Sequence, residues 1–174
     1  NAPIDLQPPC PPELTIDKLN CKQILKETEE SNDLMQPCGS EFKLDEIRLS
    51  WTNPNIVCDT TDDVLFYNIY RTERKSQPFE KVVSNIDEAI TEYYYQNENS
   101  VAGCYYVSAV DSFGNESAFV DSVCVDNCEL YRLPNVFTPN NDGMNDFFAP
   151  FPFCFVESVE LKIFDRWGVL MYET

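Results

Sequence analysis

The stretch CYYVSAVD, residues 104–111, and the stretch SAFVDSVCV, residues 117–125, decide the fold of this chain. Both are rich in aromatic and branched side chains, which favour the half-buried, pleated surface of a β-strand. The residues between them, SFGNE, contain the glycine and asparagine that tight turns require. The pattern predicts two neighbouring strands joined by a turn.

Further segments of the same kind precede this pair. Residues 46–52 alternate apolar and polar side chains up to an Asn-Pro-Asn turn, as a strand with one buried face does. The other predicted strands are residues 13–19 at a sheet edge, 64–71, 79–83 and 93–95. Six or seven short strands with almost no helix predict an all-β fold, a β-sandwich. Residues 21–45 are highly charged, and we interpret them as an insertion between two strands, either a short helical excursion or a solvated loop.

The strand residues resemble a fibronectin type III or immunoglobulin-like domain over roughly residues 13–126. The resemblance rests on Trp51, on YNIYR at 67–71, and on the alternating Tyr105, Val107, Ala109 and Asp111 followed by GNES at 114–117. It implies that the tryptophan and the alternating Tyr, Val and Ala lie in the core, and that Gly-Asn lies in the turn before the last strand. The insertion and the cysteines depart from the commonest members of this family.

Charge and cysteine content indicate the cellular compartment of the protein and exclude some classes of partner. The formal charge of −18 would repel nucleic acid and anionic lipid headgroups, so neither is an expected partner. The chain contains no run of ~20 apolar residues, so we expect no membrane insertion. We also expect a monomer. Eight dispersed cysteines without a CxxC pair, in a chain without histidine, favour disulfides over zinc. Disulfides indicate export through the periplasm to the cell surface or medium. The chain opens at Asn1 without an export signal, so we expect a fragment of a longer protein.

The sandwich topology suggests disulfide pairs. A strand over residues 13–19 would span about 23 Å at ~3.3 Å per residue, so Cys10 and Cys21 would lie at opposite poles and could not bond. Cys10 would share its pole with Cys58. Cys104 would begin one arm of the last hairpin, and Cys124 would end the other arm, opposite Cys104. The predicted bonds are Cys10–Cys58, Cys21–Cys38, Cys104–Cys124 and Cys128–Cys154, although eight cysteines allow 105 connectivities.

The composition changes after residue 127. LPNVFTPNNDGMNDFF, residues 133–148, begins with a proline-broken stretch and continues as a polar loop. VELKIFDRWGVLMYET, residues 159–174, alternates like a strand, turns at DRWG and predicts a β-hairpin. We therefore divide the chain into a proline-rich linker (1–12), a sandwich (13–127) and a partial second β domain (128–174).

These two motifs resemble the opening of the gliding-motility-associated C-terminal domain, the type B sorting tail of type IX secretion cargo in Bacteroidota. The family opens with PNVFTPNGDGxND, and here Asn141 replaces its usual glycine and Asp165 its usual asparagine. The later WDG and SGxYYY segments of the family are absent, so we expect about the first half of the domain. The resemblance implies contact with the type IX secretion machinery. The motif residues are Pro134, Asn135, Phe137, Thr138, Pro139, Asn140, Asp142, Gly143, Asn145, Asp146, Arg166, Trp167 and Gly168.

Two parts of the motif have alternative interpretations. Asn140, Asp142, Asn145 and Asp146 offer the oxygen ligands that calcium prefers, or they cap their own loop, which we favour because the DxDxDG spacing is incomplete. Arg166 and Trp167 form a recognition surface, or a turn in which the guanidinium stacks on the indole. No other metal and no cofactor is expected.

Catalysis has little support in the sequence. No histidine is available as a base, no glycine-rich phosphate loop occurs, and the acidic runs at 27–30 and 59–63 are typical of a solvated face. We predict a non-catalytic spacer and sorting module of a large exported protein with a role in gliding or adhesion. The alternatives are an adhesin module that binds glycans or proteins, with Tyr93, Tyr94 and Tyr95 as an aromatic platform, and an accessory domain of an extracellular enzyme.

Overall fold

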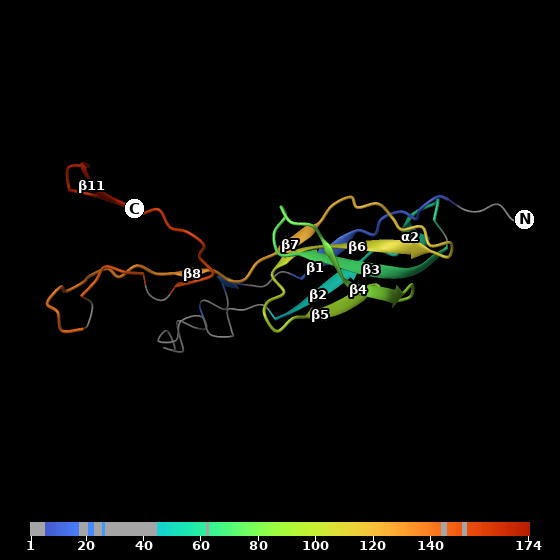
Figure 1. Cartoon of the computed structure of the whole chain (residues 1–174), viewed down its shortest axis with the longest axis horizontal. Coiled ribbons are helices and arrows are strands. Elements are labelled where there is room, and N and C mark those ends of the chain that lie inside the picture. Colours follow the sequence, from blue (N-terminus) through green and yellow to red (C-terminus); the bar gives the residue numbers. More distant parts are fainter. Residues whose placement is uncertain are drawn as a thin grey trace, which may run out of the picture. The chain divides into compact units, whose positions relative to one another are not determined.

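The computed structural model describes residues 6–17, 21–22, 26, 45–61, 63–143, 146–150 and 153–174 (Figure 1). The chain divides into two compact units. The first comprises Asn1–Leu19 and Lys43–Asn127, and the second comprises Asn20–Phe42 and Cys128–Thr174. The described residues of the predicted insertion before residue 45, which are Cys21, Lys22 and Lys26, therefore group with the second unit and not with the sandwich. Among the described residues, no helix is long and apolar enough to cross a membrane.

The first unit is a β-sandwich of two antiparallel sheets, as predicted. One sheet has the order β1-β2-β5 and the other has the order β4-β3-β6-β7. The strands are β1 (Leu14–Ile16), β2 (Glu46–Trp51), β3 (Val64–Thr72), β4 (Glu80–Asp87), β5 (Glu92–Gln96), β6 (Gly103–Asp111) and β7 (Val123–Val125), with one short helix, α2 (Pro54–Val57), after β2. This arrangement of three and four strands is a fibronectin type III-like sandwich.

Alternation along the strands builds the core between the sheets. In β2, Ile47, Leu49 and Trp51 point inward, and Leu49 is completely buried. β3 contributes Tyr67 and Ile69, and β6 contributes Tyr105, Val107 and Ala109. The tryptophan and the alternating Tyr, Val and Ala are thus core residues, as the resemblance implies.

One buried tyrosine connects the loop before β6 to the sandwich. The Tyr105 hydroxyl donates a hydrogen bond to the carbonyl of Val101, four residues upstream, and it accepts one from Arg71 Nε at 3.1 Å. Burial raises the pKa of Tyr105 to about 12, so the phenol remains a donor at neutral pH. This geometry is the tyrosine corner of immunoglobulin-like sandwiches.

The turn after β6 is held by Asp111. Its carboxylate accepts hydrogen bonds from the backbone N–H groups of Phe113 (2.9 Å) and Asn115 (2.8 Å), and from the Asn115 side chain (2.7 Å). Burial by itself would raise the pKa of Asp111, but these hydrogen bonds lower it below its ordinary value. Gly114 adopts a positive φ of 87° within this turn, which explains the Gly-Asn pair seen in the sequence.

Three strands differ in length from the sequence prediction. β4 extends to Asp87, β1 ends at Ile16, and β7 begins only at Val123. Residues 117–122 form no strand because Glu116 holds the chain against the outer face of the sheet. The Glu116 carboxylate accepts hydrogen bonds from Asn68, Tyr70 and Ser108, and the ring of Phe119 contacts the rings of Phe79 and Tyr106.

The disulfides agree with two predicted pairs and correct the other two. The structure contains Cys10–Cys58 and Cys104–Cys124, and the latter pair are direct partners in the β6–β7 register. Cys21 bonds to Cys128, with a Cα–Cα distance of 5.3 Å, and not to Cys38. Cys154 is also disulfide-bonded, but not to Cys128, which Cys21 occupies. Cys38 lies outside the described residues.

The correction has a topological reason. β1 runs antiparallel to β2, so it ends at the pole where β2 begins. β7 ends opposite Gly103, at the start of β6, and contacts β1. The two chain segments that leave the sandwich after β1 and β7 therefore depart from the same pole. The prediction joined Cys128 to the downstream Cys154, and this shared exit explains why Cys21 bonds to Cys128 instead.

The predicted linker, residues 1–12, contacts the sandwich near its end. Pro9 is buried, and Cys10 N–H donates to Thr61 Oγ1 at 3.0 Å.

The second unit contains two small antiparallel pairs. β8 (Leu130–Tyr131) pairs with β9 (Phe153–Cys154), and β10 (Lys162–Phe164) pairs with β11 (Leu170–Glu173). The latter pair is the hairpin predicted from the DRWG turn. Lys162 forms ion pairs with Glu160 at 2.7 Å and with Glu173 at 3.1 Å, on an exposed surface where such pairs stabilise little.

Candidate functional site

The first candidate site is the polar loop within the 133–148 motif. Asp146 holds it: one carboxylate oxygen accepts the backbone N–H of Asn141, and the other accepts that of Gly143 at 2.8 Å. Asn140 and Asp142 bond to each other through Asn140 Nδ2 and Asp142 Oδ2 at 2.9 Å. Asn141 and Gly143 have positive φ angles of 61° and 84°, a conformation that asparagine and glycine tolerate best.

These hydrogen bonds agree with the interpretation that the side chains cap their own loop. Both oxygens of Asp146 are used by backbone donors, which compete with a cation for the same lone pairs. Among the described residues, no group of three or more acidic, cysteine or histidine side chains could hold a metal ion. Asn145, the remaining predicted calcium ligand, lies outside the described residues.

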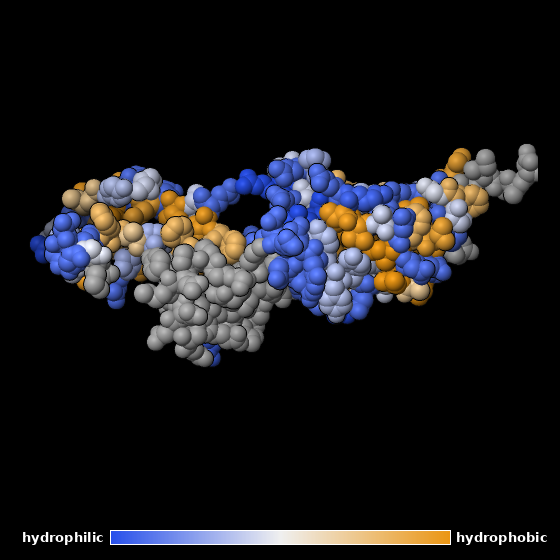
Figure 2. All heavy atoms as spheres, turned by 60° about the horizontal axis from the view of Figure 1, so that its bottom comes forward, coloured by the Kyte–Doolittle hydropathy of each residue, from blue (hydrophilic) through white to orange (hydrophobic). Residues whose placement is uncertain are grey.

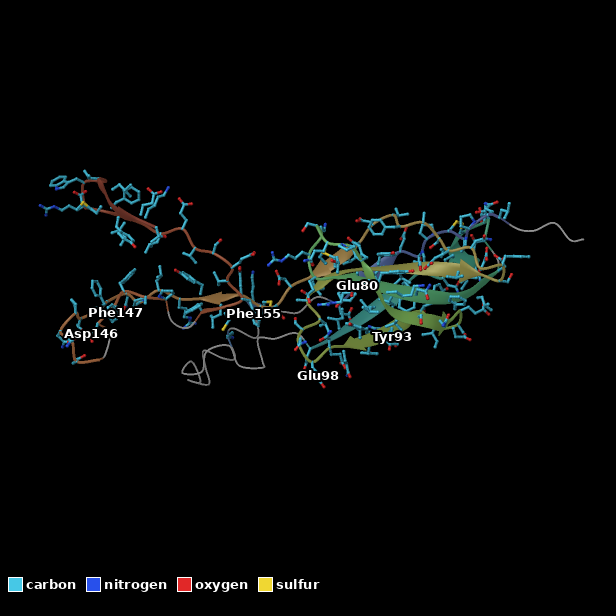
Figure 3. All side chains as sticks on the ribbon, in the orientation of Figure 1. Glu80, Tyr93, Glu98, Asp146, Phe147 and Phe155 are labelled. Carbon is cyan, nitrogen blue, oxygen red and sulfur yellow. A yellow bond between two sulfur atoms is a disulfide. The ribbon has the colours of Figure 1, made fainter. Side chains whose placement is uncertain are left out.

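The residues that lead into this loop are mostly exposed. Pro134 is half-buried, whereas Asn135, Thr138 and Pro139 are exposed. Phe137 is 46% exposed, and its ring lies 5.8 Å from that of Phe148. Figure 3 shows Asp146 and Phe147 side by side at the loop, and Phe147 is 82% exposed.

The second part of the motif is the turn between β10 and β11. Asp165 Oδ1 accepts the backbone N–H groups of Trp167 at 2.8 Å and Val169 at 2.9 Å, and Gly168 takes a positive φ of 80°. The Arg166 guanidinium lies 4.9 Å from the centroid of the Trp167 ring. The stacked pair is present, but the indole is 77% exposed and does not pack into a core.

Both parts of the motif therefore present apolar side chains to solvent. Exposed aliphatic and aromatic residues also cover both faces of the hairpin. Figure 2 shows this as orange and tan surface on the C-terminal unit. The backbone that carries these charged and aromatic groups is held by short-range hydrogen bonds that the carboxylates of Asp146 and Asp165 accept.

The predicted aromatic platform does not form. β5 alternates, so Tyr93 and Tyr95 pack against the core while Tyr94 lies on the other face, 55% exposed. Tyr95 contacts the Tyr105 ring at 5.8 Å. Three consecutive tyrosines in an extended strand cannot share one face, because successive side chains point to opposite sides.

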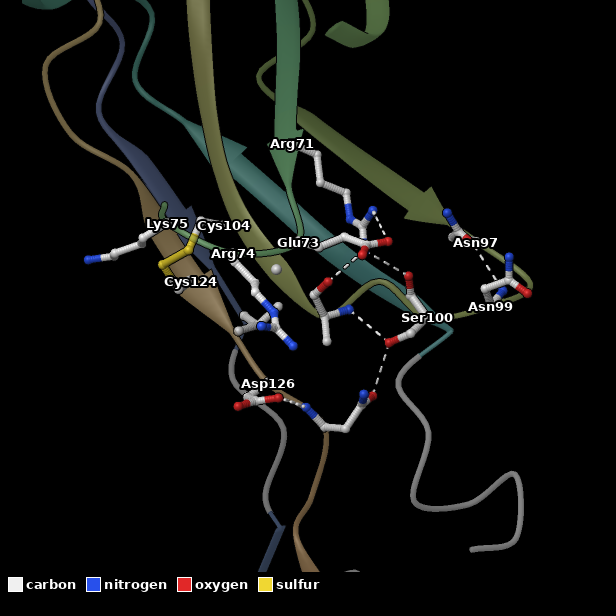
Figure 4. Close-up of a pocket in the computed structure, with 14 residues that line it drawn as sticks. Arg71, Glu73, Arg74, Lys75, Asn97, Asn99, Ser100, Cys104, Cys124 and Asp126 are labelled. Carbon is white, nitrogen blue, oxygen red and sulfur yellow. Dashed lines mark hydrogen bonds and ion pairs between the residues drawn. A yellow bond between two sulfur atoms is a disulfide. The ribbon is translucent and has the colours of Figure 1, made fainter. Parts of the chain in front are cut away.

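A feature that the sequence did not predict is a hollow at the pole of the sandwich where β3 and β7 end and β6 begins (Figure 4). Its volume is about 520 Å³, within the range of small-molecule sites. It is lined by residues of the β3–β4 turn, the β5–β6 loop and the end of β7, which lie far apart in the sequence. Only the fold brings them together, and no local motif marks them.

Residues 131–174 match the family described as the CHU_C type IX secretion signal domain. A search of characterised proteins finds an amylopullulanase from Thermoanaerobacter thermohydrosulfuricus, 36% identical over 78 residues. These residues are 45% of this chain and only 5% of that enzyme.

Among solved structures, the sandwich is similar to an Fn3-like protein from Clostridium thermocellum. The match has a TM-score of 0.44 and 16% identity, and it covers 69% of this chain and 94% of that one. Taken together, the chain combines a fibronectin type III-like sandwich with a segment, residues 131–174, that matches a type IX secretion signal domain.

Proposed function

We propose that this chain is a non-catalytic spacer and sorting module of an exported protein, in which the sandwich precedes a type B sorting tail. The observation that carries the proposal is the match of residues 131–174 to a type IX secretion signal domain. The chemistry of the segment fits this role, because Asp146 and Asp165 fix a loop and a turn whose neighbouring side chains face solvent. The partner is the type IX secretion machinery, and the destination is the cell surface or the medium of a Bacteroidota cell.

Disulfides fit the same route. Each cysteine that the structure describes is disulfide-bonded, which suits an oxidising periplasm and the space beyond it. Adhesion or gliding is the task we propose for the parent protein, with the sandwich holding the tail apart from the cargo. Calcium remains a candidate ligand of the 140–146 loop, to be tested by titration of the purified chain.

The test is a reporter that carries its own signal peptide for export to the periplasm. It is fused in frame to the gene, from the codon for Asn1 to the stop codon, and expressed in a host with type IX secretion. We expect the reporter at the cell surface or in the medium. A matched fusion that ends at residue 130 should remain periplasmic. A complete fusion that also stays in the periplasm refutes the proposal, as does export of the shortened fusion.

A second candidate is an accessory domain of an extracellular enzyme. It is supported by the 36% identity to a segment of an amylopullulanase. The two candidates differ in what the parent protein does: an accessory domain requires polysaccharide hydrolysis by the parent and none by this chain. Assay of the exported parent protein on α-glucans, beside the isolated chain, separates them.

A further inference from the structure

The hollow at the sandwich pole is built around a nearly buried cation. The Arg71 side chain is only 12% exposed. Its Nη2 donates to the carbonyls of Ser100 at 3.1 Å and Ala102 at 2.6 Å, and its Nε donates to Tyr105. All three acceptors are neutral, so they orient the guanidinium without cancelling its charge.

The positive charge of Arg71 is weakly compensated. Its ion pair with Glu73 joins Nη1 to Oε1 at 3.9 Å, beyond hydrogen-bonding distance, and the Glu73 side chain is 75% exposed. Such an exposed and distant carboxylate is strongly hydrated, so it compensates little of the Arg71 charge. A charge with so little solvent access favours an anion that replaces the missing hydration.

Two further cations border the same hollow. The lining contains Arg71, Arg74 and Lys75, against the two acidic residues Glu73 and Asp126. This balance is the reverse of the whole chain, which has 12 basic and 30 acidic residues. In Figure 4 the guanidinium groups of Arg71 and Arg74 extend toward the middle of the hollow, whereas the Lys75 amine points outward past the disulfide.

The polar residues of the lining are held in place before any ligand arrives. Ser100 Oγ donates to Asn127 Oδ1 at 3.1 Å and accepts the N–H of Ala102 at 3.0 Å, which connects the β5–β6 loop to the end of β7. Asn97 Oδ1 accepts the N–H of Asn99 at 2.9 Å. The Cys104–Cys124 bond fixes the wall behind them. A preformed site avoids the entropy cost of ordering loops upon binding.

We propose that this hollow binds the carboxylate of an acidic sugar, a uronate unit of a polysaccharide. A carboxylate can accept hydrogen bonds from Nη1 of Arg71, whose Nε and Nη2 are already bonded to the protein, and from the guanidinium of Arg74. The amide and hydroxyl groups of the asparagines and Ser100 suit vicinal sugar hydroxyls. The lining is more polar than apolar, and its apolar side chains are small, such as Ala102 and Val125, which disfavours an acidic peptide with large apolar side chains. This site is independent of residues 131–174 and of the secretion proposal.

The experiment uses the purified, oxidised chain and titrates it with trigalacturonate at low salt, followed by calorimetry. We expect saturable binding that weakens as salt is added. Arg74→Gln should reduce the affinity at least tenfold, and Arg74→Lys should restore part of it. Lys81→Gln is the matched control, because it removes one positive charge from the same unit on β4, outside the hollow, and should leave the affinity unchanged.

Two comparison ligands test whether the hollow selects an acidic sugar over a neutral sugar and over an acidic peptide. A neutral galactose trisaccharide should not bind, and triglutamate should bind at least tenfold more weakly than trigalacturonate. Absence of trigalacturonate binding to the wild-type chain overturns the proposal, as does equal binding of either comparison ligand. Equal loss of affinity in Arg74→Gln and Lys81→Gln also overturns it, because it would indicate a general charge effect.

Discussion

Removal of the Tyr105 hydroxyl should destabilise the sandwich strongly, although the ring itself would remain. Tyr105→Phe deletes the hydrogen bond to the Val101 carbonyl and leaves the Arg71 Nε donor without its acceptor. A neutral hydrogen bond contributes about 0.5–1.5 kcal/mol and one with a charged donor about 1.5–3 kcal/mol. The sum predicts a loss of about 2–4 kcal/mol in the free energy of unfolding. At a urea m-value of about 2 kcal/mol/M, the midpoint would fall by about 1–2 M.

The control for this prediction is another tyrosine in the same core. Tyr67 is as completely buried as Tyr105, but among the described residues its hydroxyl has no hydrogen-bond partner. Tyr67→Phe removes the same atom and should be neutral or stabilising, because an unsatisfied buried hydroxyl is costly.

Urea unfolding followed by fluorescence separates the two outcomes. In a Trp167→Phe background, the remaining tryptophan is Trp51, which is buried in the sandwich and reports on that unit alone. If Tyr105→Phe and Tyr67→Phe shift the midpoint equally, the loss reflects ring repacking and the hydrogen-bond argument is refuted.

Three further predictions concern the same pole and the opposite turn. Replacement of both Cys104 and Cys124 by serine opens a loop with a sequence separation of 20 and should cost about 3 kcal/mol in the free energy of unfolding, measured by the same assay against the oxidised wild type; an unchanged midpoint would refute this. Gly103→Ala should cost more than 1 kcal/mol, since a Cβ would lie 2.5 Å from the Thr72 carbonyl oxygen and φ is +146°; an unchanged midpoint would contradict this. Because hydrogen bonds lower the pKa of Asp111 in the folded state, its contribution is complete above its ordinary pKa of 3.8 and is lost as pH falls through the lower folded value. Asp111→Asn should therefore flatten the acid side of the stability profile below pH 4, and a profile of unchanged slope would count against it.

The sandwich could be predicted because its signals are short-range and repeated. β2 alternates buried with more exposed residues, and β6 places the core residues Tyr105, Val107 and Ala109 at every second position before the Gly-Asn turn that follows it. β7 was predicted too long because its sequence favours a strand equally well over residues 117–125. What ends the pairing is Glu116, whose partners Asn68, Tyr70 and Ser108 come from strands 8 to 48 residues away. A single sequence contains no local mark of such a bond.

The disulfides show the same difference between pairs that local sequence predicts and pairs that only the assembled fold determines. Cys104–Cys124 follows from hairpin register alone, and Cys10–Cys58 follows from the order of two adjacent strands. Cys21–Cys128 joins residues 107 apart in sequence. Its prediction needs the pole at which β1 and β7 end, which depends on how both sheets are assembled. The hollow was missed for the same reason, because Arg71, Ser100 and Asn127 meet only when three connections converge.

The secretion motif was found because its structure is local. Asp146 bonds to backbone groups three and five residues away, and Asp165 bonds to groups two and four residues away. Each aspartate therefore needs only its own loop or turn to hold the chain in shape. A signal of this kind keeps its local conformation when the surrounding unit contributes few buried side chains, and it remains readable from the sequence. In the sandwich the strands can be predicted from the sequence, but the long-range hydrogen bonds that resist its unfolding, such as those of Glu116 and Arg71, cannot. This division favours a stable spacer followed by an exposed recognition segment.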